Sequence, residues 1–397
     1  MNFKSISYYL GLSCFPISIL SFINILYSSY FDYFLSINSY ILTLGVSFFF
    51  GLTLFLIGKK SIKRINYIEQ LIFVVLVYLL ISFLIALPFY FSNYQVTFLN
   101  SLFESISGIT GTGFSIFNNI KYLDPTLILW RSSSQWIGGL YFLFFLILIF
   151  SNNKFNYKMI NLTYSGDGSI NSENNIKRLL LKIFILYSVL SFSIFISLNV
   201  VDVRMFNSLN LSMSLISAGG FIPTDSLNMI IKSNPQKIIF IISLLVSILN
   251  FFLIFYIFEK KIVIRDHKED FYLFFLAVLF IIFVYLTDNK GFHAIVNVLS
   301  SFSNSGLSLL ETENNLSLLF IFIASLGGSL VSNTSGIKLT RIYILIKSTS
   351  SEIVKLISPN SIINKTIFNT EKKITDENIK ISFLIFISFF LSLFILS

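Results

Sequence analysis

Nine long apolar segments constrain this chain more than any other feature of its sequence. Each supplies roughly the 20 apolar residues that an α-helix needs to cross the hydrocarbon core of a bilayer. They lie at about 8–27, 37–57, 68–91, 126–150, 179–198, 237–258, 271–286, 316–346 and 379–396. Of the 397 residues, 55% are hydrophobic and only 12% are charged, whereas soluble domains carry about 25% charged residues. The sequence therefore predicts an all-α, polytopic membrane protein.

The positive charges predict how these spans are oriented. Most of the 28 Lys and Arg residues fall on one side, in the stretches 59–64, 154–182, 260–268 and 338–380. Cytoplasmic loops carry such an excess, so we expect this side and the N-terminus to be cytoplasmic and the C-terminus to be outside. The net charge of +9 is thus a topology signal, and we expect no nucleic-acid partner.

Few residues of this chain suit catalysis or metal binding. There is one cysteine, Cys14, and the two histidines, His267 and His293, lie far apart in the sequence. No HExxH, P-loop or GxGxxG motif is present, and the spans hold almost no carboxylates. We expect a protein that is not an enzyme and holds no cofactor or metal beyond a transported ion. A membrane-embedded enzyme or carrier is the alternative from another class.

Three polar segments between the spans repeat one another. They align without a gap as FLNSLFESISGITGTGF (98–114), MFNSLNLSMSLISAGGF (205–221) and GFHAIVNVLSSFSNSGL (291–307). The sixteenth position is always glycine, a hydroxyl residue stands three positions before it, and a serine stands six positions before it. These residues are Gly113, Gly220 and Gly306; Thr110, Ser217 and Ser303; and Ser107, Ser214 and Ser300.

This repeat predicts a short helix followed by an extended segment that re-enters the membrane. Non-helical backbone at membrane depth is tolerated where protein or a water-filled cavity surrounds it. The C-terminal end of the helix would direct partial negative charge at the membrane centre, and the next residues would offer carbonyl and hydroxyl oxygens to a dehydrated cation. The glycine would permit a positive φ. The alternative is that the small residues only let helices approach closely; three copies on one side of the membrane favour the cation path.

The repeats and their surroundings resemble the TrkH/KtrB superfamily of potassium uptake proteins, and within it the TrkH branch most closely. FESISGITGTGF (103–114), SAGGFIPTDS (217–226) and SNSGLS (303–308) resemble three selectivity-filter segments. WRSSSQWIGGLYF (130–142) is similar to the helix after the first filter, and SLGGSLVSNTSGIKLTR (325–341) is similar to a broken helix. The resemblance implies a pseudo-fourfold, channel-like architecture in which four such repeats follow two extra helices.

The resemblance also implies the domain boundaries. Residues 1–60 would be the two extra helices, 61–153 the first repeat, 154–262 the second and 263–348 the third. Residues 349–397 would be a cytoplasmic linker and the first helix of an incomplete fourth repeat that lacks its filter. We therefore expect about nine spans with three re-entrant loops. A truncated, split or non-conducting subunit that needs a further polypeptide is the alternative.

Site residues, partners and location follow from the same resemblance. The selectivity filter would consist of Thr110, Gly111, Thr112, Gly113, Ser217, Ala218, Gly219, Gly220, Ser303, Asn304, Ser305 and Gly306. The gate would comprise Gly327, Gly328, Ser329, Ser332, Asn333, Thr334, Ser335, Gly336, Lys338 and Arg341. We expect the pore-forming subunit of a Trk-type system in a bacterial inner membrane, which takes up K⁺, with Na⁺ as the alternative ion. A homodimer and a cytosolic nucleotide-binding regulator of the TrkA/KtrA type are the expected partners.

Four polar residues have interpretations that the sequence leaves open. Glu104 either adds negative potential to the ion path or anchors neighbouring backbone. Arg131 either pairs with a loop acid such as Asp124 or is an interfacial anchor. Lys338 either opposes the exit of cations below the filter or extends to the cytoplasmic interface. Asn250, inside the sixth span, is expected to hydrogen-bond another helix.

Overall fold

The computed structural model describes residues 2–33, 36–61, 65–150, 173–251, 253–254, 268–288, 291–309, 316–358, 365–369 and 373–396. Within these ranges the regular structure is helical, apart from one isolated bridge between Thr366 and Lys373, which confirms the predicted all-α class. The described residues group into two compact units. The first comprises 2–150 and 173–243, and the second begins at Leu244.

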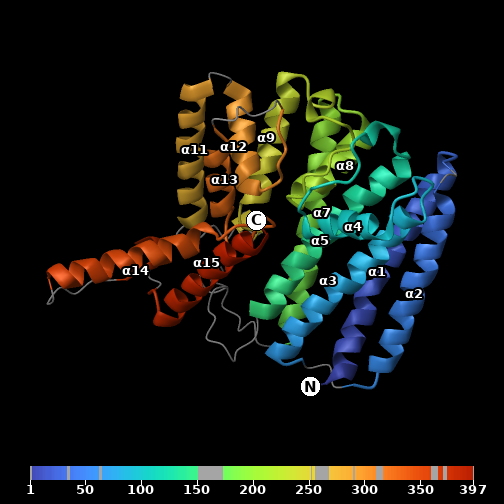
Figure 1. Ribbon diagram of the computed structural model, residues 1–397, viewed down its shortest axis with the longest axis horizontal. Coiled ribbons are helices and arrows are strands. Elements are labelled where there is room, and N and C mark those ends of the chain that lie inside the picture. The colour runs from blue at the N-terminus through green and yellow to red at the C-terminus, as the bar shows by residue number, and fades with distance from the viewer. Residues whose placement is uncertain are drawn as a thin grey trace. The chain divides into compact units, whose positions relative to one another are not determined.

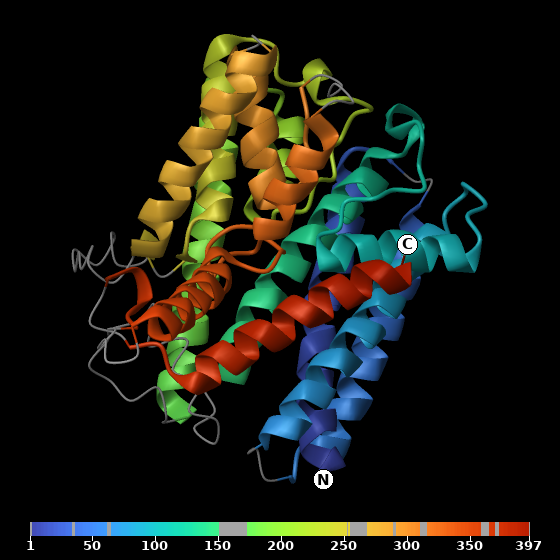
Figure 2. The same cartoon turned by 60° about the vertical axis from the view of Figure 1, so that its left-hand side comes forward.

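The first unit starts with two long helices that pack along each other. They are α1 (Phe3–Tyr30) and α2 (Ile37–Gly58), and both ribbon views show them side by side (Figures 1 and 2). Glycine permits the close contact, because a Cβ on Gly58 would lie 2.5 Å from the carbonyl oxygen of Lys4. These helices correspond to the predicted extra pair.

Two copies of the repeat complete the first unit. The first copy contains α3 (Tyr67–Tyr90), α4 (Phe98–Thr110), the short helix η1 (Ile120–Tyr122) and α5 (Pro125–Phe150); the second contains α7 (Glu173–Val200), α8 (Met205–Ile216), η2 (Leu227–Met229) and the first part of α9 (Asn234–Ile248). The short helix α4 packs against α3 and α5, and α8 packs against α5 and α7. The helix α5 is fixed in the core by Trp130, whose indole donates to the carbonyl of Ile85 over 3.0 Å. Because α5 contacts both short helices, it positions both loops that follow them.

The second unit contains the third copy and the C-terminal helices. Its elements after α9 are α11 (Lys268–Asp288), α12 (Gly291–Ser303), α13 (Ser317–Leu326), α14 (Leu339–Ile357), η5 (Ile367–Asn369) and α15 (Asp376–Leu396). The short helix α12 packs against α11 and α13, as Figure 1 shows. A small core that includes Ile344, Phe368 and Ile374 joins α14 to the segment before α15.

Each predicted span has a helix at its place, and two of the nine are interrupted. Six described helices, α1, α2, α3, α7, α11 and α15, are long and apolar enough to cross a membrane, while α9 and α13 are shorter apolar helices. The break predicted for 316–346 is confirmed, because α13 ends at Leu326 and α14 begins at Leu339. The span predicted at 237–258 is also interrupted, which the sequence analysis did not anticipate. There α9 ends at Ile248 and residues 249–250 are not helical; residues 252 and 255–258 of this span lie outside the described ranges.

Candidate functional site

The three predicted filter loops share one backbone conformation. The second predicted filter residue of every loop has a left-handed φ, of 68° at Gly111, 56° at Ala218 and 58° at Asn304. The final glycine also has a positive φ, of 82° at Gly113, 82° at Gly220 and 66° at Gly306. The prediction that these glycines serve a positive φ is confirmed.

The same pair of hydrogen bonds closes each loop onto its short helix. The amide of the third filter residue donates to the carbonyl of the repeated serine, over 3.0 Å for Thr112 to Ser107, 2.8 Å for Gly219 to Ser214 and 3.2 Å for Ser305 to Ser300. The amide of the second donates to the next carbonyl along the helix, that of Gly108, Leu215 or Ser301. These two bonds around a left-handed residue form a Schellman motif, which satisfies carbonyls at the helix C-terminus.

The hydroxyl at the first filter position is tied to its own helix in every copy. Thr110 Oγ1 donates to the Ile106 carbonyl over 2.6 Å, Ser217 Oγ to the Met213 carbonyl over 2.9 Å, and Ser303 Oγ to the Ser300 carbonyl over 3.0 Å. A hydroxyl has one hydrogen and two lone pairs. Thr110 Oγ1 also lies 2.7 Å from Thr112 Oγ1, and Ser303 Oγ lies 2.8 Å from Ser305 Oγ. Where the hydrogen points back into the helix, the hydroxyl oxygen can act only as an acceptor, as a cation ligand requires.

The first and second filter loops lie against each other in the first unit. A Cβ on Gly113 would lie 2.5 Å from the carbonyl oxygen of Gly219, and a Cβ on Gly111 would lie 3.6 Å from that of Ser217. Backbone therefore meets backbone at Gly113, and no side chain fits there. The structure brings together eight of the twelve predicted filter residues in this way; the other four belong to the second unit.

A buried ion pair anchors the residues that follow the first filter. Arg131 Nε lies 2.7 Å from Glu104 Oε1, and the two side chains are 1% and 0% exposed. The Glu104 carboxylate also accepts from the Ser115 hydroxyl at 3.0 Å and from the Ile116 amide at 2.9 Å. The anchoring interpretation of Glu104 thus agrees with the contacts. The predicted pairing of Arg131 with Asp124 is wrong, because Asp124 Oδ1 instead accepts from the Thr126 amide at the start of α5.

The same face of α5 holds the second filter loop. Gln135 Nε2 donates to the carbonyl of Gly219 over 2.5 Å, and its Oε1 accepts from the amide of Phe221 at 3.1 Å. The guanidinium of Arg131 lies 4.3 Å from the centroid of the Phe221 ring, within the range of a cation–π contact. One helix thus fixes two filter loops through side chains one turn apart.

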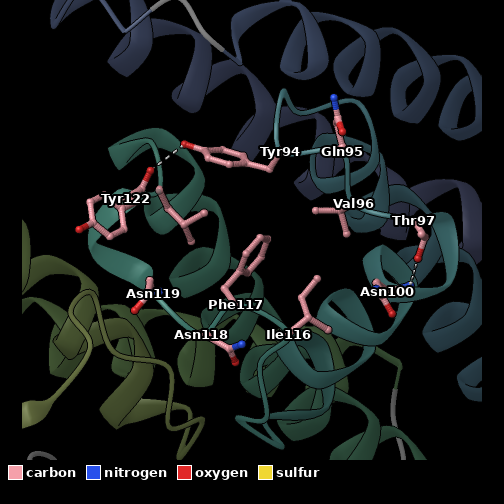
Figure 3. A pocket seen from close by; sticks show the side chains of 11 residues that line it. Tyr94, Gln95, Val96, Thr97, Asn100, Ile116, Phe117, Asn118, Asn119 and Tyr122 are labelled. Atoms are coloured by element: carbon pink, nitrogen blue, oxygen red, sulfur yellow. Dashed lines mark hydrogen bonds between the residues drawn. The ribbon is translucent and has the colours of Figure 1, made fainter.

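A cavity of about 420 Å³ with a mixed polar and apolar lining opens beside the first filter loop. The segment before α4 contributes Tyr94, Gln95, Val96 and Thr97, and α4 itself contributes Asn100. The segment after the filter contributes Ile116, Phe117, Asn118, Asn119, Tyr122 and Leu123. Figure 3 shows these side chains around the hollow, with the Tyr94 hydroxyl bonded to the Tyr122 carbonyl over 3.2 Å. Its lining is amide, hydroxyl and apolar, without a charged group.

Nine of the ten predicted gate residues form a compact loop between α13 and α14, and the tenth, Arg341, lies in the first turn of α14. The loop closes on itself, because a Cβ on Gly336 would lie 2.9 Å from both Cα and N of Gly327. The amides of Ile337 and Lys338 donate to the carbonyls of Ser325 and Leu326 over 2.9 and 3.0 Å. These bonds place the start of α14 directly at the end of α13.

The break in α9 is occupied by this loop. The carbonyl of Ile248 accepts from the Ser329 amide at 3.0 Å, and the amide of Phe251 donates to the Val331 carbonyl over 2.9 Å. The amide of Asn250 donates to Asp270 Oδ1 over 3.0 Å, so a backbone bond from Asn250 reaches another helix. The backbone groups that the break frees are therefore satisfied by the loop and by α11.

A carboxylate on α11 holds the loop at two points. Glu269 accepts from the Leu330 amide through Oε2 and from the Thr340 amide through Oε1, each at 3.2 Å. The Lys338 ammonium donates within the loop, to Ser332 Oγ at 3.2 Å, the Thr334 carbonyl at 2.5 Å and Thr334 Oγ1 at 2.9 Å. Lys338 is buried, which does not fit the alternative that it extends to the interface.

Comparison with known proteins gives consistent relatives. An uncharacterized cation transporter of Methanocaldococcus jannaschii is 25% identical over 329 residues, which cover 82% of this chain and 68% of that protein. The Trk system potassium uptake protein TrkH of Halomonas elongata is 23% identical over 343 residues, covering 82% of this chain and 71% of that protein. No family model matches the chain. The crystal structure of the potassium transporter TrkH from Vibrio parahaemolyticus matches with a TM-score of 0.84 at 20% identity, covering 100% of this chain and 85% of that one.

The chain is similar to Trk potassium uptake proteins over about four fifths of its length. It has the fold of TrkH over its whole length, and it is a multi-pass membrane protein. The sequence analysis did not identify Gln135 as a residue that holds the second filter loop, or Glu269 as one that holds the gate loop. Gln135 stands within the QWIGG motif, a signal that could have drawn attention to it. No sequence motif marked Glu269, because an acidic residue in the first turn of a helix, such as α11, is common.

Proposed function

We propose that this chain forms the path by which K⁺ crosses the membrane in a Trk-type uptake system. Several relatives are Trk potassium uptake proteins and one is an uncharacterized cation transporter, and the fold is that of a potassium transporter. The observation that carries the proposal is the threefold repetition of one loop, with a Schellman motif, a hydroxyl and a positive-φ glycine at fixed positions. A packing role for small residues does not require three identical backbone conformations.

The proposed filter works by replacing water around K⁺ with protein oxygens. Backbone carbonyls can take the place of the hydration shell of an alkali cation, and the C-terminal end of each short helix adds partial negative charge. Selectivity needs these oxygens to stay in place. The ion pair of Glu104 with Arg131 and the two hydrogen bonds of Gln135 supply that restraint for the first two loops.

The proposal extends to the gate, the location and the partners. The loop between Gly327 and Gly336 would control passage, because it interrupts a span between α13 and α14. The distribution of Lys and Arg supports a cytoplasmic N-terminus, and we place the protein in a bacterial inner membrane. A homodimer and a cytosolic regulator of the TrkA/KtrA type are proposed from the superfamily resemblance, and cross-linking in membranes would test both.

Growth rescue tests the proposed function. The chain is expected to restore growth at low K⁺ to cells that lack their own K⁺ uptake systems. Gly113→Ala should abolish this rescue without preventing membrane insertion, because φ is 82° there and a Cβ would meet the Gly219 carbonyl at 2.5 Å. Gly45→Ala is the matched control, since a Cβ there meets no atom within 4 Å. Full rescue by Gly113→Ala would exclude the first loop as a filter segment.

A further inference from the structure

The ammonium group of Lys338 is bound in the way that a metal cation is bound. The residue is only 5% exposed. Its Nζ has three oxygen neighbours, namely Ser332 Oγ at 3.2 Å, the Thr334 carbonyl oxygen at 2.5 Å and Thr334 Oγ1 at 2.9 Å. One carbonyl and two hydroxyl oxygens around a positive charge are the ligand types that alkali cations accept.

The oxygens around Nζ are arranged to accept. Ser332 Oγ donates its own hydrogen to the Ser329 carbonyl over 2.7 Å, and Thr334 Oγ1 already receives the amide of Gly328 at 2.9 Å. An ammonium group has three donors and no acceptor, and it resembles K⁺ in charge and size. The loop therefore presents one backbone and two hydroxyl oxygens to a positive charge.

The Lys338 ammonium is attached to the chain by a long side chain, whereas the oxygens of Ser332 and Thr334 belong to a loop that is hydrogen-bonded to other elements. Glu269 accepts from the amides of Leu330 in the loop and Thr340 at the start of α14, at 3.2 Å each. The lysine side chain, by contrast, is a flexible four-carbon stem. Its departure would leave the oxygens in place.

We propose that the loop between α13 and α14 contains a monovalent-cation site, formed by Ser332 Oγ and the two oxygens of Thr334, in which the Lys338 ammonium is a tethered occupant. The site takes K⁺ or Rb⁺ when the ammonium leaves. This inference rests on the proposed function only in making K⁺ the natural competitor. A permeating ion and the lysine then compete for the same oxygens, and occupation by the ion frees the lysine from the loop.

Equilibrium binding of radioactive Rb⁺ to the purified full chain tests the proposal. Lys338→Met is expected to bind one more Rb⁺ per chain than the wild type does. Lys347→Met, which removes a positive charge further along α14, is the matched control and should bind no additional ion. Adding Ser332→Ala and Thr334→Val to Lys338→Met should remove the extra site. An unchanged Rb⁺ stoichiometry in folded Lys338→Met would overturn the proposal.

A second variant guards against a loss of folding. Lys338→Leu removes the charge and leaves no donor that could occupy the loop oxygens, so this second apolar replacement, of a different shape, should also gain one Rb⁺. Absence of the extra ion in this variant would overturn the proposal as well. Rb⁺ uptake by the wild type is measured in parallel and tests the proposed function separately. An extra ion in the variants without wild-type uptake would support the site and reject the transport function.

Discussion

Replacing Arg131 by methionine is expected to destabilise the first filter loop strongly. The change leaves the Glu104 carboxylate buried, at 0% exposure, without its partner at 2.7 Å. It also removes the hydrogen bond from Arg131 Nη2 to Ser115 Oγ at 2.9 Å. Breaking a buried ion pair by removing one partner costs about 3–5 kcal/mol, which corresponds to roughly 10²–10⁴ in the unfolding equilibrium.

The double variant Arg131→Met/Glu104→Gln separates the unpaired charge from the lost packing. The glutamine is neutral, and its oxygen can still accept from the Ser115 hydroxyl or the Ile116 amide. Because no uncompensated charge remains, we expect the double variant to be more stable than Arg131→Met alone. The difference measures how much of the cost comes from burying one charge.

Unfolding by sodium dodecyl sulfate in mixed micelles, followed by tryptophan fluorescence, measures these free energies. Lys365→Met is the matched control. Its Nζ lies at the same 2.7 Å from Glu352 Oε1, but the two side chains are 20% and 59% exposed. Exposed pairs contribute little to stability, so no measurable change is expected there. A loss in Arg131→Met no larger than that in Lys365→Met would refute the reasoning.

Three further changes test the supports of the loops. Gln135→Leu removes both hydrogen bonds to the second filter loop, and the preference for Rb⁺ over Na⁺ in vesicle uptake should fall by about tenfold; an unchanged preference would count against a role in the filter. Gly138→Ala places a Cβ against the Ile109 carbonyl, so the yield of folded protein in size-exclusion chromatography should drop, whereas Gly45→Ala should match the wild type. Glu269→Ala releases two backbone amides of the gate loop, and basal Rb⁺ leak from vesicles should rise; an unaltered leak would contradict the idea that this acid holds the gate.

The helices and the conformation of the loops could be predicted from the sequence because both leave local signals. A bilayer demands a fixed length of apolar helix, which the sequence displays nine times. The aligned glycines predicted a positive φ, and it occurs at all three. At the second filter position the residue type varies between Gly111, Ala218 and Asn304, so φ there could not be predicted from composition. The repeated serine and glycine on either side of this position indicated that the three loops share a conformation, whereas the residue at the position itself did not.

The contacts that hold the loops could not be predicted, because they join residues distant in the sequence. Asp124 lies close to Arg131 along the chain, yet the ion pair is made with Glu104, which faces Arg131 across the packing of α4 on α5. The break in α9 is stabilised by the gate loop through Ser329 and Val331. Within the apolar stretch around the break, only Asn250 hinted at an interruption.

Structure determination with Rb⁺ in place of K⁺ tests the central claim most directly, because the anomalous signal locates the ion. The account predicts Rb⁺ at the backbone oxygens of the loops 110–113 and 217–220, which lie against each other in the first unit. Rb⁺ bound elsewhere in the chain, with these loops lacking ions at concentrations that support uptake, would contradict it.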